Sequence, residues 1–396
     1  MPGTTTTNPP QEEEELPKKN NNETMTTLDT LVVFYNRDKV IESDESPETE
    51  TFAARCHCGN VNFTVTLPTS YLPLNAYICS CTLCRYTHGT FGSYHVSLPQ
   101  GVAPEWTSNT LNLSVYKTPG SGAGGHGQRI FCPTCGAHNG HYEAWAGQWI
   151  IEPSLFDAPI FWRFRGIGFP NSAGDGGVLS WLPEVGGRKL TQVSMDHDFA
   201  PDYEAEVGAD GGERLRAECK CGGVSFTIPR PGEKVKGDAY LRRYVSPTDP
   251  GKWKAFLDFC RDCRLVSSAH GVPWVLVPRT VLEPEVPPDL RFGTVKTYKS
   301  SEDVTRGFCG VCGATVFIKC KDRSPTEETE VLNIAVGILR APEGAKAENW
   351  VTWRAGNPEW VEDAMDYDPE FVEAVVDGHR EWAIEKYGEA LDFDVM

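Results

Sequence analysis

Cysteine motifs that occur in a fixed order constrain the fold of this chain more than any other sequence feature. Cys56 and Cys58 form a Cys-x-Cys-Gly motif, residues 79–84 read Cys-x-Cys-x-x-Cys, and Cys132 and Cys135 form Cys-x-x-Cys-Gly. A closed structural zinc site takes four protein ligands, whereas a reactive site takes three and keeps one position open. The two outer motifs together supply four thiolates, and the middle motif supplies three. The spacing therefore predicts a closed four-thiolate zinc and an open three-thiolate zinc in one domain.

The same series of motifs returns in the second half of the chain. Cys219 and Cys221 repeat the first motif, residues 258–263 repeat the middle motif, and Cys309 and Cys312 repeat the last. Because order and approximate spacing are kept, the sequence predicts a duplicated domain. We call the two halves copy one and copy two.

The repeat and the charge pattern together divide the chain into five parts. Acidic, polar stretches at the start and between the copies read as a tail and a linker, because they lack the apolar residues that a core needs. The expected parts are an acidic tail with a short apolar segment at 1–51, copy one at 52–195, an acidic linker at 196–213, copy two at 214–367, and a C-terminal helix with an acidic tail at 368–396.

The segments between the motifs favour short strands. Residues 61–67 and 224–228 alternate between apolar and polar side chains, which is typical of half-buried strands, and residues 331–336 form an apolar run that fits a buried strand. Residues 369–391 instead carry apolar side chains at helical spacing. Asp368 is a candidate N-cap, and the proline after it suits the first helical position. The sequence thus predicts a mainly β protein with one C-terminal amphipathic helix.

Composition narrows the cellular setting and the partners. The 14 cysteines, with no secretory signal segment, favour thiolates in a reducing compartment over seven disulfides, so we expect a cytoplasmic or nuclear protein. The net charge of −18 comes from the tails and the linker, and no Lys/Arg cluster stands out, so nucleic-acid binding is not expected. No apolar run of about 20 residues is present, so no membrane span is expected.

The combined seven-cysteine pattern resembles the glutathione-dependent formaldehyde-activating enzyme and centromere protein V family. The motifs that carry the resemblance are Cys-x-Cys-Gly-x-Val, Cys-x-Cys-x-x-Cys-Arg and Arg-x-Phe-Cys-x-x-Cys-Gly. The resemblance implies a strongly coiled antiparallel β-sheet fold of the Mss4-like type in each copy. Tandem copies with Asp-Gly-Gly at 175–177 and Trp-Leu-Pro at 181–183 look like the fungal branch of the family.

The resemblance also implies a role for each cysteine. The outer pairs would hold a structural zinc, and the middle three would hold a second, catalytic zinc, so that copy one carries two zinc ions and copy two carries one or two. The implied structural ligands are Cys56, Cys58, Cys132 and Cys135 in copy one and Cys219, Cys221, Cys309 and Cys312 in copy two. The implied ligands of the catalytic zinc are Cys79, Cys81 and Cys84.

Copy two departs from the pattern at its middle motif, where Asp258 aligns with Cys79. A carboxylate can bind zinc, so Asp258, Cys260 and Cys263 can still form a site, with weaker zinc affinity and a more Lewis-acidic ion. The alternative is a decayed site kept as a scaffold. Cys320 has no counterpart among the family cysteines, and we expect a plain thiol there.

Four further residues beside the middle motif of copy one are candidates for catalysis or substrate binding. His88 and His95 are candidate proton shuttles, and copy two has Ser267 and Trp274 in their places. Arg85 is a candidate clamp for a substrate carboxylate, and Tyr94 is a candidate pocket residue. The two histidines and Arg85 can instead be structural. Arg129, three residues before Cys132, is a second candidate clamp, but for it we favour hydrogen bonds to backbone carbonyls.

The expected activity is that of a zinc-dependent carbon–sulfur lyase similar to S-(hydroxymethyl)glutathione synthase. Its substrate would be a thiol adduct of the glutathione type, or a small electrophile, bound at the open zinc of copy one. One alternative is a non-catalytic zinc scaffold that serves protein interaction. The other is a hydrolase or dehydratase that uses zinc-bound water on a secondary metabolite. The sequence leaves the oligomeric state open.

Overall fold

The computed structural model describes residues 48–107, 113–119, 128–144, 146–157, 161–194 and 198–395. The acidic tail and its apolar segment, expected at 1–51, lie almost entirely outside the described residues. None of the helices in the described ranges is long and apolar enough to cross a bilayer.

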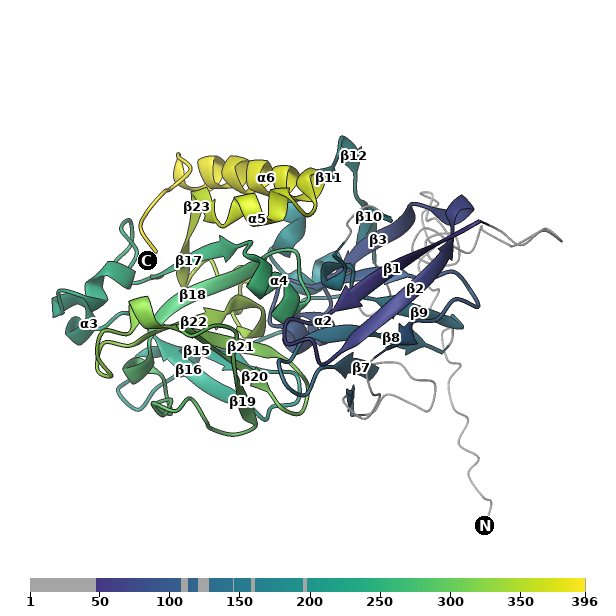
Figure 1. Cartoon of the computed structure of the whole chain (residues 1–396). Coiled ribbons are helices and arrows are strands. Elements are labelled where there is room, and N and C mark those ends of the chain that lie inside the picture. Colours follow the sequence, from purple (N-terminus) through teal and green to yellow (C-terminus); the bar gives the residue numbers. More distant parts are fainter. Residues whose placement is uncertain are drawn as a thin grey trace, which may run out of the picture.

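Two large sheets dominate the molecule, one in each half of the chain, and they lie side by side in Figure 1. The sheet of copy one has the strand order β13-β10-β3-β4-β9-β8-β7-β6, and that of copy two has the order β19-β20-β21-β22-β18-β17-β23. Read from opposite ends, seven strands match one to one, so the structure confirms the duplication and the mainly β fold. In copy one the strands are β3 (Leu74–Cys79), β4 (Ser93–Ser97), β6 (Ser114–Lys117), β7 (Gln128–Phe131), β8 (His138–Glu143), β9 (Gln148–Ile151), β10 (Trp162–Gly168) and β13 (Thr191–Val193). In copy two they are β17 (Trp253–Asp258), β18 (Val272–Pro278), β19 (Val295–Lys299), β20 (Val304–Cys309), β21 (Thr315–Cys320), β22 (Val331–Ala335) and β23 (Val351–Glu359).

Smaller sheets carry the first cysteine motif of each copy. The strand orders are β1-β2-β5 in copy one, β14-β15-β16 in copy two, and β11-β12 for a two-stranded ribbon. The bounds are β1 (Thr49–Arg55), β2 (Asn62–Pro68), β5 (Glu105–Trp106), β11 (Glu184–Val185), β12 (Arg188–Lys189), β14 (Glu206–Val207), β15 (Glu213–Glu218) and β16 (Ser225–Pro229). The strands expected at 61–67, 224–228 and 331–336 are therefore present as β2, β16 and β22. β14 falls within the segment expected to be a linker.

Most strand pairs are antiparallel, but one edge of each large sheet is not. β10 pairs in parallel with β3, and β23 pairs in parallel with β17 at the matching place in copy two. β13 adds a further parallel strand to copy one only. The strand of each copy that ends at the middle motif is thus held between an antiparallel and a parallel neighbour, which fixes the position of the first ligand.

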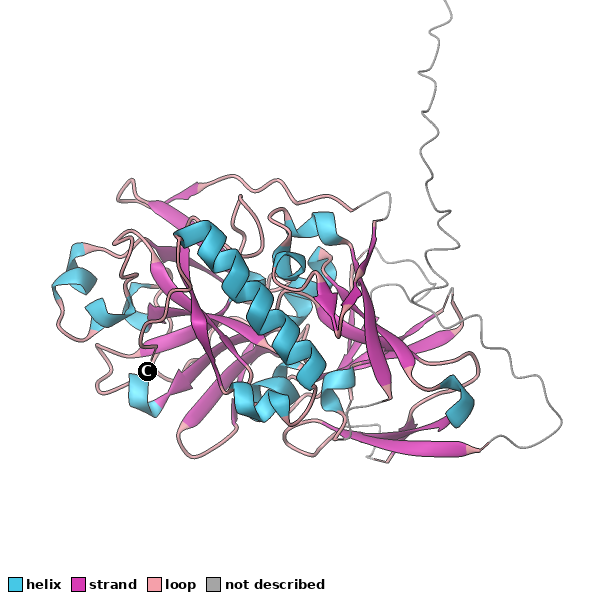
Figure 2. Ribbon diagram, turned by 90° about the horizontal axis from the view of Figure 1, so that it is seen from above, coloured by secondary structure: helices cyan, strands magenta, loops and turns pink. Residues whose placement is uncertain are grey.

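Five α-helices occur in the described part of the chain, and Figure 2 shows the longest of them lying across the sheets. They are α2 (Thr82–His88), α3 (Glu233–Gly237), α4 (Arg261–Ser267), α5 (Val361–Met365) and α6 (Pro369–Tyr387). α2 and α4 each start within the middle motif. The expected C-terminal helix is confirmed as α6, in which the Asp368 side chain accepts a hydrogen bond from the Phe371 N–H at 3.2 Å.

The two copies share one hydrophobic core. A single cluster of buried residues includes strands of both sheets as well as α6. The contacts between the copies are reciprocal: a Cβ placed on Gly136 would lie 2.8 Å from the Phe308 ring, and one placed on Gly313 would lie 2.8 Å from the Phe131 ring. Such exchanged contacts are what a two-fold arrangement of similar units produces. The copies therefore pack as a pseudo-dimer within one chain.

Candidate metal centres

Four groups of side chains in the described structure can hold a metal ion, two in each copy. Within each group the ligand atoms all lie within 4.8 Å of one another. The groups are Cys56, Cys58, Cys132 and Cys135; Cys79, Cys81 and Cys84; Cys219, Cys221, Cys309 and Cys312; and Asp258, Cys260 and Cys263. These are the groupings that the sequence predicts.

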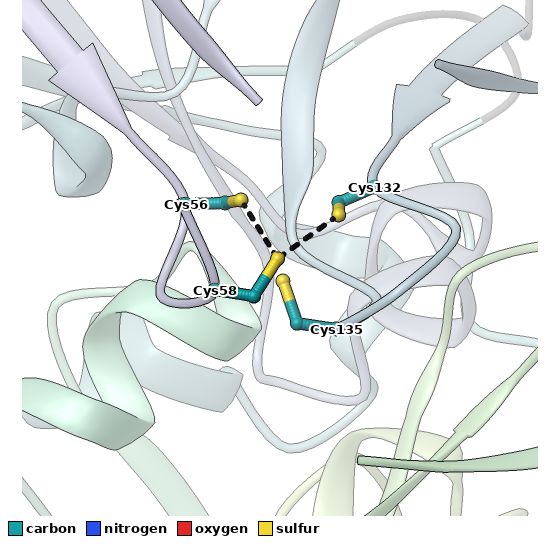
Figure 3. A group of neighbouring side chains, drawn as sticks. All are labelled: Cys56, Cys58, Cys132 and Cys135. Carbon is teal, nitrogen blue, oxygen red and sulfur yellow. Dashed lines mark hydrogen bonds between the residues drawn. The ribbon is translucent and has the colours of Figure 1, made fainter. Parts of the chain in front are cut away.

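The four-thiolate group of copy one forms where two tight turns meet, as Figure 3 shows. The first turn joins β1 to β2, and the Gly59 N–H donates to the Cys56 carbonyl at 3.0 Å. The second turn joins β7 to β8. The Cys58 sulfur lies 3.5 Å from the sulfurs of both Cys56 and Cys132, so the two turns bring their thiols to one point.

Copy two builds its four-thiolate group in the same way. The Cys221 sulfur lies 3.5 Å from those of Cys219 and Cys309. The Cys309 sulfur also lies 3.0 Å from the Thr294 hydroxyl and accepts the Cys312 N–H at 3.4 Å. Hydrogen bonds to sulfur stabilise a thiolate, which is the form that binds metal.

The three-thiolate group of copy one spans the end of β3 and the start of α2. Cys79 is the last residue of β3, Cys81 is the N-cap of α2 with its sulfur 3.5 Å from the Cys84 N–H, and Cys84 lies in the first turn. The Arg129 guanidinium donates to the Cys84 sulfur at 3.3 Å. Hydrogen bonds from Cys79 and Cys81, together with the nearby charge of Arg129, hold the pKa of the Cys84 thiol well below its ordinary value.

A buried histidine and glutamate network lies against the three-thiolate group. The His88 Nδ1–H donates to the Cys84 carbonyl oxygen at 3.0 Å, and its Nε2 lies 3.4 Å from the Glu152 carboxylate. His95 has its Nε2 hydrogen-bonded to the Ser93 hydroxyl and 3.8 Å from the same carboxylate. Both histidines and Glu152 are buried, so the network is shielded from solvent.

The network belongs to copy one alone. Glu152 precedes the short 3-10 helix Pro153–Leu155, and at the matching place, before the 3-10 helix Val336–Ile338, copy two has Ala335. Ser267 and Trp274 replace the two histidines. The two middle motifs are therefore set in different chemical surroundings, and within the described residues only that of copy one has this histidine and glutamate network beside it.

Two of the residues predicted to bind substrate have other contacts. The Arg85 guanidinium donates to the backbone carbonyls of Ser80 at 3.0 Å and Ser172 at 2.8 Å. These hydrogen bonds connect the two backbone segments. Tyr94 follows Ser93 and precedes His95 on β4, so its side chain points to the opposite face of the sheet. There its ring stacks on that of His270 in copy two, with 4.9 Å between ring centroids. Both residues thus have structural roles, and we leave them out of the candidate site.

The middle motif of copy two is assembled on the same elements. Asp258 is the last residue of β17, and one of its carboxylate oxygens lies 3.1 Å from the Cys263 sulfur. The Cys260 side chain caps α4, accepting the Cys263 N–H at 3.3 Å. Arg306 donates to the Cys263 sulfur at 3.3 Å, as Arg129 does to Cys84 in copy one. The replacement of cysteine by aspartate therefore keeps three converging ligands.

A cleft of about 690 Å³ opens beside the copy-two motif. Its walls include all three candidate ligands, and further lining residues are Phe256, Arg306, Ile318, Arg323, Asn333 and Trp360. A volume of this size is typical of small-molecule sites. The aspartate-containing motif is thus accessible to a ligand.

Comparison with known proteins agrees with these centres. A sequence profile of the glutathione-dependent formaldehyde-activating enzyme family matches residues 51–163 and 243–354, more than half of the chain. The chain belongs to this family. A curated relative from Halomonas elongata, named "Putative glutathione-dependent formaldehyde-activating enzyme", is 31% identical over 98 residues, which cover 25% of this chain and 54% of that protein. The chain spans about half the length of this relative.

The family profile and the structure give different starting points for copy two along the chain. The second matched segment starts at residue 243, after Cys219 and Cys221. The structure nevertheless brings these two thiols to Cys309 and Cys312. Both copies of this formaldehyde-activating enzyme family member therefore have the complete set of outer cysteines in place.

Two residues near the copy-one centre, and one contact of a third, were not predicted from the sequence. Glu152 and the Cys84 contact of Arg129 were not predicted, and neither was His138, whose ring stacks on that of His88 with 4.1 Å between centroids. A signal was present for Glu152, because a carboxylate directly after the apolar pair Ile150 and Ile151 is out of place in a buried strand unless it has partners.

Proposed function

We propose that this protein is a zinc-dependent carbon–sulfur lyase whose reaction centre is the three-thiolate group of copy one. Its substrate would be a thiol adduct of the glutathione type or the small electrophile from which such an adduct forms. The family, and the name of the relative from Halomonas elongata, support this class of reaction. The carrying observation is that Cys79, Cys81 and Cys84 converge next to a buried histidine and glutamate network that copy two lacks.

The donor sets fit zinc. Four thiolates complete a tetrahedral site, so the two outer groups would be closed and structural, whereas three thiolates leave one position for substrate. Zinc bound there supplies a positive charge that lowers the pKa of a bound thiol and polarises a carbonyl. Arg129 would offset part of the negative charge of the thiolates, since it donates directly to Cys84.

The histidine network would handle the proton of the reaction. His95 lies on the same face of the sheet as Cys79, because Ser93 pairs with Cys79 and His95 pairs with Tyr77 in the register of β3 and β4. Glu152 lies between His95 and His88 and would stabilise whichever imidazole carries the additional proton. A positioned acid or base of this kind contributes about 10² to 10⁴ in rate.

We also propose the cellular setting and the division of the chain that the sequence predicts. We propose a cytoplasmic or nuclear protein, since the cysteines are free thiols and a reducing compartment keeps them so. We also propose that residues 52–195 and 214–367 are the two copies in evolutionary terms, with α6 added to the second.

The test compares one cysteine from each middle motif. Cys81→Ser should abolish formation of the adduct from formaldehyde and glutathione, measured by NMR, because it removes a ligand of the proposed reaction centre. It should also lower the zinc content while leaving the melting temperature nearly unchanged, because the closed four-thiolate groups are untouched.

Cys260→Ser is the matched control, since Cys260 holds the same place at the start of α4. We expect it to leave adduct formation close to that of the wild type. If Cys260→Ser is as damaging as Cys81→Ser with the fold intact in both, the reaction centre lies in copy two. If the wild type itself gives no rate above the uncatalysed reaction, this substrate pair is excluded.

A further inference from the structure

We propose that the copy-two cleft is a separate binding site for a small organic acid with one carboxylate. Arg323 and Arg306 would bind the carboxylate. Another donor atom of the acid would reach a metal ion held by Asp258, Cys260 and Cys263. This site lies outside the reaction centre proposed for copy one. Three of its residues, Asp258, Arg323 and Asn333, have no chemical equivalent at the matching positions of copy one.

The cleft lies over one face of the copy-two sheet. Phe256 and Asp258 are alternate residues of β17 and so share a face, and Arg306, Ile318 and Asn333 come from β20, β21 and β22. The metal ligands and the arginines thus line one continuous space. A ligand resting on this face can touch both.

The cleft is polar at two positions where copy one has apolar side chains. Arg323 and Ala146 occupy matching positions after the last cysteines, Cys312 and Cys135. Asn333 and Ile150 also occupy matching positions, because Asn333 pairs with β18 at the same place in the sheet where Ile150 pairs with β4.

In copy one, Ala146 and Ile150 pack against Cys79 and Cys84 in a small apolar cluster. In copy two, the Arg323 guanidinium instead donates to the Asn333 side-chain oxygen at 3.2 Å. Copy two therefore has a charged, hydrogen-bonded pair beside its motif at the two positions where copy one has apolar side chains.

The cleft is also open where copy one is covered. Phe169 follows β10, donates its N–H to Val193 of β13 at 2.8 Å, and packs on the cluster that contains Cys79. Its counterpart Trp360 follows β23 with a similar left-handed φ of 59°, but no strand like β13 lies beyond it within residues 198–395. Trp360 is 56% exposed and forms part of the wall, so the ligand can enter beside it.

The two arginines lack an anionic oxygen as a partner. Arg306 and Arg323 are only 4% and 6% exposed, yet in the described part of the chain neither forms an ion pair with a carboxylate. The Arg323 guanidinium donates to the Val395 carbonyl, the Cys320 sulfur and the Asn333 side-chain oxygen, none of which is an anionic oxygen. Arg306 already donates to the Cys263 sulfur, whereas the Arg323 guanidinium has no anionic partner within the described residues. A buried charge without a counter-ion is costly, and a carboxylate bound in the cleft would supply one to Arg323.

The rest of the lining limits the charge of the ligand. Six carboxylates and three basic side chains line the cleft. A ligand with several negative charges would meet repulsion from Asp262, Asp322 and Asp363, whereas one carboxylate can be satisfied by the two arginines. The site therefore suits a small acid of low net charge better than glutathione, which has two carboxylates.

The test measures binding of mercaptoacetate by calorimetry to zinc-loaded full-length protein that carries Cys81→Ser, so that the copy-one centre does not contribute. Mercaptoacetate offers a thiol to the metal and one carboxylate to the arginines, and 2-mercaptoethanol offers the thiol alone. We expect mercaptoacetate to bind at one site, about tenfold to hundredfold more tightly than 2-mercaptoethanol, as expected for a charged hydrogen bond. Glutathione should bind more weakly than mercaptoacetate.

Arg323→Ala, which restores the copy-one residue, should erase this preference and keep the zinc content. Arg243→Ala is the matched control: Arg243 pairs with Asp394 in the same C-terminal segment that Arg323 holds through Val395, but it does not line the cleft. Asn333→Ile, which matches Ile150, provides a second variant if Arg323→Ala does not fold.

The proposal is overturned if 2-mercaptoethanol or glutathione binds as tightly as mercaptoacetate, or if the preference survives in the folded Arg323 or Asn333 variant. Since the copy-one centre is already disabled, these outcomes are independent of the proposed lyase activity.

Discussion

At the scale of single residues, His379 on α6 is an unusual buried histidine. Its ring stacks on that of Trp181 with 4.0 Å between centroids, and neither ring nitrogen has a hydrogen-bond partner among the described residues. Burial, together with the nearby charge of Lys346, lowers the pKa of His379 to about 3. The folded protein therefore keeps this imidazole neutral at pH values where an unfolded chain would protonate it.

This difference in pKa predicts acid sensitivity that one substitution should reduce. Between pH 6.5 and 3 the unfolded chain binds a proton at His379 that the folded protein does not, so stability falls as the pH falls through this window. From pH 7.5 to 5.5 the loss in the free energy of unfolding is about 1.4 kcal/mol for one such group. In His379→Leu we expect this part of the loss to vanish in denaturant titrations at the two pH values. Other buried histidines titrate in both proteins and cancel, so equal losses in wild type and variant would contradict the assignment.

The same scale shows where sequence reasoning stops. The ligand groups could be predicted because each pair or triplet of cysteines is local and its spacing restricts what it can bind. The environment of the ligands could not, because Arg129 reaches Cys84, and Glu152 reaches His88, from segments distant in sequence. Arg85 illustrates the converse: it follows Cys84 directly, yet its guanidinium turns to backbone carbonyls.

At the scale of elements, α6 is held at its first turn by one side chain with several partners. Asp368 caps the helix through the Phe371 N–H and also accepts from the Trp162 indole of copy one at 3.4 Å. The same carboxylate lies 3.3 Å from His270. The cap therefore ties the helix to both copies.

Removing this cap should destabilise the protein measurably. We expect Asp368→Ala to cost about 1–2 kcal/mol of unfolding free energy, since an N-cap alone contributes about 1 kcal/mol and further partners are lost. Asp368→Asn keeps an accepting oxygen and should cost only a few tenths of that amount. Thermal unfolding followed by circular dichroism distinguishes the two, and equal melting temperatures for the Ala and Asn variants would argue against a capping role.

The elements also differ in how well they could be predicted. α6 carries its start signal, an aspartate followed by proline, and its apolar spacing within one segment. The parallel pairs of β10 and β23, and the additional strand β13, depend on contacts between segments far apart in the chain. No local sequence pattern predicts such pairing. That the middle motif of copy one is covered and that of copy two is open could therefore be learned only from the structure.

At the scale of the whole molecule, the copies are joined backbone to backbone. The Gly337 N–H donates to the Gly89 carbonyl at 3.1 Å, and the Lys220 N–H donates to the Tyr86 carbonyl at 3.0 Å. His57, in the first cysteine motif of copy one, lies 3.0 Å from Asp262 on α4 of copy two. Because the motifs themselves touch the other copy, we expect the two halves to fold as one cooperative unit.

A single methyl group at the contact between the copies should test this expectation. A Cβ on Gly337 would lie 2.2 Å from the backbone N and O of Thr90 in copy one, and backbone atoms cannot move aside as a flexible side chain can. Gly337→Ala should therefore force the copies apart and cost at least about 1–3 kcal/mol, the usual penalty of overpacking. Calorimetry should show either one transition at a much lower temperature or two separate transitions.

The matched control is Gly232→Ala, since a Cβ there would meet no atom within 4 Å. Its effect should stay within about 0.5 kcal/mol, as for other exposed positions. Zinc content after brief heating gives a second measurement, because cooperative folding would make Gly337→Ala release metal from the outer groups of both copies together. A Gly337→Ala protein that melts like the wild type in one transition would show that the contact between the copies can relax, and loss of zinc from copy two alone would show that copy one folds independently.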